Sequence, residues 1–195
     1  PVSALIADRW SLAERPGIVL NCPPAWRPDE PAAPRPTRLR EAAGVPTGRP
    51  IVLYQGGFSV DRGVEELVAA IDQPALRALD AVAVFMGYGR LQGWLERAAA
   101  ERPDRVRVLP AVPPDELLEW TAGCDVSFVG QPPRTLNQRM NLPNKLFESI
   151  MAGAPVVVAR DNEQCRLVSA EGIGRCASID DPASVAEELA ALLRM

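Results

Sequence analysis

A cation and a carboxylate stand close together in the segment from Pro143 to Val158. Lys145 is the only lysine of the chain, and Glu148 follows it three residues later. In a helix this spacing puts both side chains on one face. The carboxylate could accept hydrogen bonds from both hydroxyls of a ribose, as the acidic residue of dinucleotide-binding folds does. On the residues alone, a surface ion pair that contributes roughly 0.2–0.5 kcal/mol is the simpler interpretation.

A glycine-rich stretch, Gln55–Gly63, provides a second set of candidate residues. Gly56 and Gly57 would let backbone N–H groups approach a phosphate, and Arg62 adds a full positive charge near the start of a helix. The stretch matches neither the GxxxxGK[ST] nor the GxGxxG pattern. A tight strand-to-helix turn with a solvent-facing arginine remains the alternative interpretation.

Two further loops carry weaker signals. The segment Met86–Arg90 places Gly87 just past an apolar run, which ordinary turn chemistry also explains. The segment Leu109–Leu118 offers an apolar backbone around Val112 that could flank a planar base, although a helix entry is the commoner role of such a segment.

The elements that must position these residues alternate along the chain. Apolar runs bounded by turn residues predict strands, and stretches with apolar residues at helical spacing predict helices between them. The helix that carries Lys145 and Glu148 is expected to be capped by Asn144 and to end at Gly153. Strands are expected at 51–54, 81–86, 106–109, 126–129, 156–159 and 175–178, and the other helices at 64–71, 91–100, 115–121, 166–170 and 184–193.

This alternation predicts an α/β fold with a doubly wound, Rossmann-like parallel sheet. Strands that are apolar on both faces need helices on both sides, and right-handed crossovers give that arrangement. In such sheets, ligands bind outside the carboxyl ends of the strands. The loops that follow the strands, including 130–144 and 160–165, are therefore the place to look for a site.

The first 47 residues differ from the rest. We expect a short helix at 3–14, a short strand at 17–21 and a proline-rich connector from Pro23 to Pro50 that is interrupted by a helix at 37–43. Residues 1–47 are thus predicted to be an N-terminal extension, and residues 48–195 a compact domain. The chain lacks an initiator methionine, so we expect it to be part of something longer.

Composition narrows the functional classes. A net charge of −4 argues against binding nucleic acid, and the absence of histidine removes the commonest general base and metal ligand. The four cysteines are far apart, which predicts neither a zinc site nor a disulfide scaffold and favours a reduced, cytoplasmic setting. No run approaches the roughly 20 apolar residues that would span a bilayer, and the N-terminus lacks the layout of a signal peptide.

Taken in order, these pieces resemble the C-terminal half of a GT-B glycosyltransferase of family 4, also called group 1. The similarity spans nearly the whole chain. It rests on a glycine-rich turn followed by a basic residue and glycine, a strand ending Gly-x-Gly, a short proline turn before a leucine-rich helix, a Cys-Asp-Val phrase, and Pro-Asn-Lys-Leu-Phe-Glu with Met-Ala-Gly-Ala-Pro-Val-Val behind it. Each piece is weak alone, but the ordered set is specific.

The resemblance implies a role in binding a nucleotide-sugar donor. Glu148 matches the second glutamate of the family's Glu-seven-residues-Glu motif, whose partner is the ribose, and Arg62 matches the basic residue that faces the diphosphate. The implied donor-binding residues are Gly56, Gly57, Arg62, Gly87, Val112, Asn141, Asn144, Lys145, Leu146 and Glu148.

The chain departs from the family pattern at two positions. Met140 stands where many members have the first glutamate, and Gly57 stands where an arginine is common. Lys145 is then expected to join Arg62 as a cation for the diphosphate. The amides of Gln138, Asn141 and Asn144 are candidates for contacts to the sugar.

The resemblance therefore implies the donor-binding half of a retaining hexosyltransferase that needs no bound metal or cofactor. The acceptor site and any catalytic base would lie in an N-terminal domain outside this chain, so the chain alone is expected to be inactive. Membrane association of a full enzyme has no support in these residues. A degenerate domain kept for scaffolding, or half of a sugar-nucleotide epimerase, remain alternatives, although such epimerases depend on histidine.

Overall fold

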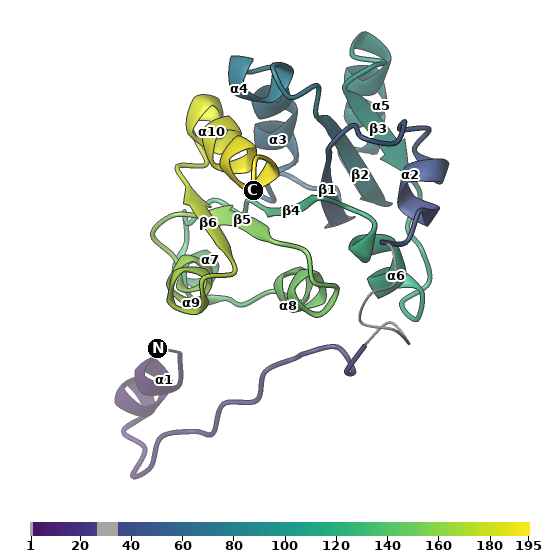
Figure 1. Ribbon diagram of the computed structural model, residues 1–195. Coiled ribbons are helices and arrows are strands. Elements are labelled where there is room, and N and C mark those ends of the chain that lie inside the picture. The colour runs from purple at the N-terminus through teal and green to yellow at the C-terminus, as the bar shows by residue number, and fades with distance from the viewer. Residues whose placement is uncertain (1, 27–34) are drawn as a thin grey trace.

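The computed structural model describes residues 2–26 and 35–195, and its core is a parallel sheet of six strands (Figure 1). The strand order is β3-β2-β1-β4-β5-β6, which confirms the predicted doubly wound, Rossmann-like α/β fold. The strands are β1 (Ile51–Gly57), β2 (Val82–Tyr88), β3 (Val106–Leu109), β4 (Val126–Val129), β5 (Val156–Ala159) and β6 (Gly174–Ala177).

Each central strand buries both of its faces, which is why its sequence is continuously apolar. In β1, Val52 and Tyr54 pack into one hydrophobic cluster, whereas Ile51 and Leu53 pack into another on the opposite face. Burying both faces requires two layers of helices. The predicted pattern of apolar runs therefore located all six strands to within a few residues.

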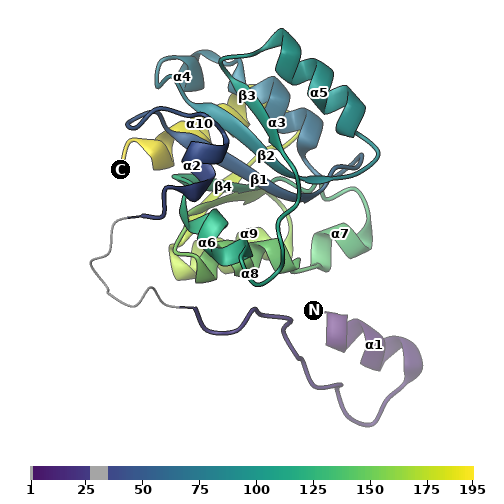
Figure 2. The same cartoon turned by 90° about the vertical axis from the view of Figure 1, so that its right-hand side faces the viewer.

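Helices cover both faces of the sheet (Figure 2). One layer contains the helices that share a cluster with Val52 and Tyr54, and the other contains those that pack on the opposite face. The first layer is α3 (Val64–Ile71), α4 (Pro74–Arg77), α5 (Gln92–Glu101) and α10 (Pro182–Leu193), and the second is α2 (Arg38–Ala42), α6 (Leu117–Ala122), α8 (Asn144–Met151) and α9 (Glu163–Glu171).

The sheet opens between β1 and β4, where the direction of winding reverses. β1 pairs with β2 along its full length, from Ile51–Val82 to Gly57–Tyr88. Its pairing with β4 covers only Val52 and Leu53. The far end of β1 therefore has no ladder partner on the β4 side, and a crevice of this kind is where ligands bind in open α/β sheets.

The glycine-rich stretch is more regular than expected, because β1 continues through both glycines. Gly87 of β2 lies so close to it that an added Cβ would stand 1.9 Å from the carbonyl oxygen of Gly56. Only a glycine allows the two strand ends to approach this closely. The N–H of Phe58 then donates to the carbonyl of Tyr88 at 2.7 Å and closes the turn.

The N-terminal part differs from the prediction. Helix α1 (Val2–Trp10) forms where a helix was expected and lies away from the sheet (Figures 1 and 2). The predicted strand at 17–21 is wrong, since the chain there pairs with no strand of the described residues and Val19 is 95% exposed. Part of the predicted proline-rich connector, residues 27–34, lies outside the described residues.

Two short helices were not predicted. Besides α4, helix α7 (Leu136–Met140) forms within the segment expected to be a loop. It begins with a capping box in which Thr135 accepts from the N–H of Gln138, and Gln138 accepts from the N–H of Thr135 at 2.8 Å. The capping box uses the side-chain oxygen of Gln138 and not its NH2 group, so the contact of this amide to a sugar stays a prediction.

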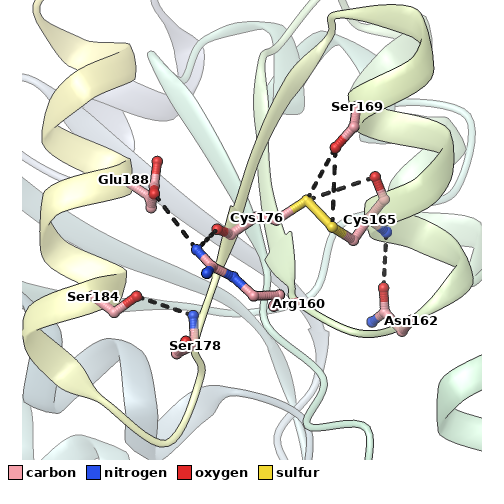
Figure 3. The surroundings of a disulfide bond; sticks show 8 residues. All are labelled: Arg160, Asn162, Cys165, Ser169, Cys176, Ser178, Ser184 and Glu188. Carbon is pink, nitrogen blue, oxygen red and sulfur yellow. Dashed lines mark hydrogen bonds and ion pairs between the residues drawn. A yellow bond between two sulfur atoms is a disulfide. The ribbon is translucent and has the colours of Figure 1, made fainter.

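A single disulfide, which was not predicted, joins Cys165 and Cys176 (Figure 3). Cys165 lies in the first turn of α9 and Cys176 in β6, with Cα atoms 5.6 Å apart. After α9 the chain turns back, so β6 runs beside the helix. This brings together two cysteines that are 11 positions apart in the sequence. Cys22 and Cys124 are free.

Candidate functional site

A cavity of about 390 Å³ lies at the carboxyl ends of β1 and β2, beside the opening between β1 and β4. The ends of both strands, the loop after β3, and helices α6 and α8 form its walls. The residues that line it are Gln55, Gly56, Gly57, Met86, Gly87, Tyr88, Ala111, Val112, Leu117, Pro143, Asn144, Lys145 and Glu148.

Helix α8 brings the charged groups to this cavity. Pro143 precedes its first turn and the helix begins at Asn144, whose side chain makes no capping bond, so the expected Asn144 cap is not formed. The amide oxygen of Asn144 instead accepts from Asn21 at 2.9 Å. The expected end is confirmed, because Gly153 adopts a left-handed φ of +72° directly after the helix.

Lys145 crosses the end of β1. Its ammonium nitrogen lies 4.1 Å from the centre of the Tyr54 ring, and a Cβ built on Gly56 would stand 3.5 Å from that nitrogen. The aromatic face stabilises the cation. Burial, reinforced by the nearby positive charge of Arg62, nevertheless lowers the pKa of Lys145 to about 7, and Glu148 opposes this shift.

Glu148 is half-buried one turn along α8. Burial raises the pKa of its carboxyl above the ordinary value, and the hydrogen bond from Gln55 and the charge of Lys145 oppose that rise. The Gln55 side-chain nitrogen donates to Glu148 Oε2 at 2.9 Å. Within residues 2–26 and 35–195, no ion pair joins Glu148 to Lys145. The interpretation of Lys145 and Glu148 as a surface ion pair is therefore wrong. Both residues instead line one cavity.

Arg62 approaches Lys145 from the turn before α3. Together with Val129, Gln131 and Pro143, these two cations line a small enclosed cavity next to the larger one. Pro143 and Lys145 belong to both cavities, so the two are contiguous. Two like charges without a carboxylate between them make this end of the site suitable for an anion.

Two of the predicted site residues, Asn141 and Leu146, line neither cavity. The side chain of Leu146 is fully buried in the hydrophobic cluster beneath α8 and does not reach the cavity. Asn141 uses both ends of its amide, donating to Gln131 at 2.8 Å and accepting from Gln164 at 3.1 Å. These bonds fix the loop before α8. The other eight predicted residues line the two cavities.

The sequence did not single out Gln55 or Thr121. Gln55 is 2% exposed and Thr121 fully buried, and the Thr121 hydroxyl donates to the Gln55 side-chain oxygen. The available signal was a glutamine within an otherwise apolar strand, since a buried polar side chain requires a partner. Identifying that partner required the placement of α6 and α8.

The described residues contain neither a membrane-spanning helix nor a cluster of side chains that could bind a metal. No helix in the described ranges is both long and apolar enough to cross a membrane. Within those same ranges, no three acidic or cysteine side chains gather in a way that could hold a metal ion.

Comparison with known structures shows the same architecture. Sucrose-phosphate synthase from Thermosynechococcus elongatus matches with a TM-score of 0.64 and 22% identity over 81% of this chain and 39% of its own. The α,α-trehalose-phosphate synthase (UDP-forming) from Burkholderia vietnamiensis gives 0.62 and 16% over 82% and 40%. HepE from Anabaena, solved in complex with UDP and glucose, gives 0.59 and 18% over 81% and 41%.

The chain thus spans about two fifths of the length of these proteins. At 16–22% identity, the likeness shows a shared fold. Comparison with curated protein sequences finds no match. The family described as "Glycosyl transferases group 1" matches residues 49–195, which is most of the chain. Since this match covers well over half of the chain, and the sheet is doubly wound as predicted, this chain belongs to the group 1 glycosyltransferase family.

Proposed function

We propose that this chain is the donor-binding half of a glycosyltransferase that transfers a sugar from a nucleoside-diphosphate sugar to an acceptor hydroxyl. The observation that carries the proposal is the placement of Glu148 and Lys145 along one cavity with no ion pair between them among the described residues. Both are available to a ligand that carries hydroxyls at one end and negative charge at the other.

Each part of the cavity suits one part of such a donor. The Glu148 carboxylate would accept from the ribose hydroxyls, and the apolar backbone around Val112 would lie against the base. Lys145 and Arg62 would hold the diphosphate at the junction of the two cavities. Membership of the group 1 glycosyltransferase family supports this placement of the base, ribose and diphosphate along the cavity.

The chemical contribution of this half would be electrostatic. A departing nucleoside diphosphate gains negative charge in the transition state, and fixed cations that face that charge lower the barrier. Lys145 and Arg62 are the cations in place. We infer a hexosyl donor and a retaining outcome from the family resemblance, with no metal required.

The acceptor side would come from another part of the protein. This chain covers about two fifths of the structures it matches, so a second domain would provide the acceptor site and any base. Nucleic acid is not expected to bind, because the net charge of the chain is −4.

Calorimetric titration with UDP, GDP and ADP tests the proposal. We expect one of the three to bind, and Glu148→Ala to weaken it by about tenfold to a hundredfold, since a hydrogen bond to a charged group contributes roughly 1.5–3 kcal/mol. Glu187→Ala is the matched control, because Glu187 is an exposed glutamate on α10, across the sheet from α8. Folded protein that gives no heat with any of the three would favour a scaffolding role.

A further inference from the structure

A buried glutamine lies directly behind the carboxylate of the site. Gln55 sits near the end of β1 at 2% exposure, among apolar neighbours. Burying an amide costs stability unless its groups are hydrogen-bonded. Here both ends are used: the nitrogen donates to Glu148 Oε2 at 2.9 Å, and the oxygen accepts from the hydroxyl of Thr121.

Thr121 anchors this connection to a third element. Its side chain is fully buried in α6, and its hydroxyl oxygen lies 2.8 Å from the carbonyl oxygen of Leu117, one turn earlier. The chain of contacts therefore runs from α6 through the end of β1 to α8. Each member is tied to regular structure, so the last one, Glu148, is held from behind.

The chemistry of an ionised carboxylate fixes the orientation of the amide. A carboxylate only accepts hydrogen bonds, so the NH2 group of Gln55 must face Glu148 and its oxygen must face Thr121. The terminal torsion of a free glutamate is broad and roughly two-fold. A fixed donor on Oε2 removes that freedom. Among the described residues, nothing donates to Oε1, which leaves it to the cavity.

We propose that Gln55 is a positioning residue that orients the Glu148 carboxylate and thereby sets the preference for ribose over deoxyribose. This inference rests on the proposed function, in which Glu148 accepts from the ribose. Two hydroxyls can be bound at once only by a carboxylate held in one orientation. Losing the 2′-hydroxyl then removes one of two good bonds, whereas a freely turning carboxylate would discriminate less.

The test is the ratio of affinities for a ribonucleoside diphosphate and its 2′-deoxy counterpart. The probe is whichever of UDP, GDP and ADP binds the 195-residue chain most tightly. We expect the wild type to prefer the ribonucleotide by about tenfold. Gln55→Met keeps the length of the side chain and removes both hydrogen bonds, and it should bring the ratio within about twofold of unity, mainly by weakening the binding of the ribonucleotide.

Two variants at Thr121 give an independent reading. Thr121→Val keeps the shape of the side chain but removes the hydroxyl that holds Gln55, so the ratio should fall. Thr121→Ser keeps the hydroxyl and should retain the wild-type ratio. If Gln55→Met does not fold, this pair carries the test alone.

Each result has one meaning. An unchanged ratio in Gln55→Met or Thr121→Val, or an equal loss of affinity for both nucleotides, overturns the positioning role while leaving the proposed function in place. A wild type that binds both nucleotides equally also overturns it. A wild type that binds none of the ribonucleotides overturns the proposed function, and this inference with it.

Discussion

Lys145 reaches the end of β1 from helix α8. The family pattern often places an arginine on the glycine turn, at the position that is Gly57 here. Lys145 instead extends from α8 across Gly56 and rests on the face of Tyr54. A cation is thus present at the strand end although position 57 itself carries none. Its surroundings, burial and a neighbouring arginine, make its charge sensitive to pH.

Binding of a nucleotide-sugar should weaken as the pH rises above neutrality. The free protein holds Lys145 at a pKa of about 7, and a bound diphosphate would raise that pKa by stabilising the ammonium. Affinity should therefore be constant below pH 7 and fall above it, by up to about tenfold per pH unit, until the pKa of the complex is reached. Calorimetry from about pH 6 to about pH 9 measures this.

Lys145→Arg is the control for that titration. A guanidinium stays charged across the whole range, so this variant should bind with an affinity that does not depend on pH. A nucleotide-sugar is the appropriate ligand, because its esterified diphosphate does not titrate near neutrality. The same decline with pH in Lys145→Arg would assign the effect to another group.

At the scale of elements, the turn before α3 depends on one glycine. Gly63 has φ +90°, and a Cβ there would stand 2.5 Å from the carbonyl oxygen of Gly130. Gly153 also has a positive φ, but a Cβ there would meet nothing within 4 Å. The two positions therefore separate backbone strain from steric clash.

Alanine at these two glycines should destabilise the fold unequally. Gly153→Ala should lower the free energy of unfolding by about 1 kcal/mol, the cost of a left-handed conformation. Gly63→Ala should lower it by about 3 kcal/mol, because the Cβ also forces the strand ends apart. Urea denaturation measures both, and equal losses would mean that the turn relaxes without cost.

The disulfide between α9 and β6 can be tested by counting thiols. Protein purified without reductant and then denatured should titrate two thiols, those of Cys22 and Cys124, and four after reduction. Reduction should lower the free energy of unfolding by about 2–3 kcal/mol, given the short loop that the bond closes. Four thiols without reductant would contradict the bond and support the reduced, cytoplasmic setting expected from the sequence.

The sheet was predictable because its strands are apolar on both faces, a pattern that few other structures produce. The same reasoning failed at 17–21, where Ile18 and Val19 are apolar but remain exposed and no partner strand is present. A strand needs a neighbour, and a run of residues does not show whether one exists. Helix α7 was missed because it is only five residues long and buries none of them, although its capping box at Thr135 and Gln138 can be read from the sequence.

The site was predictable where a residue's role follows from its element. Glu148 and Lys145 share a helix face, and Gly87 follows a strand, so their positions along the cavity could be expected. Asn141 could not be assigned, because its amide turns inward to Gln131 and Gln164, which come from distant segments. Tertiary contacts decide such cases.

At the scale of the whole molecule, the chain corresponds to one part of a longer protein. We expect the 195-residue protein to bind a nucleotide and to transfer no sugar, since it corresponds to about two fifths of the structures it matches. Release of nucleoside diphosphate from a nucleotide-sugar, measured with and without simple sugar acceptors, checks this. Sustained turnover by this chain would show that both halves of the chemistry reside in it.

The segment before residue 27 touches α8 at both of its ends. Asn21 donates to Asn144 at 2.9 Å where the helix starts, and the N–H of Trp26 donates to the Met151 sulfur at 3.4 Å where it finishes. Lys145 and Glu148 lie in the helix between these two contacts. The N-terminal segment is therefore hydrogen-bonded to both ends of the helix that carries the two charged groups, so any displacement of α8 must either break these two contacts or move the segment with it.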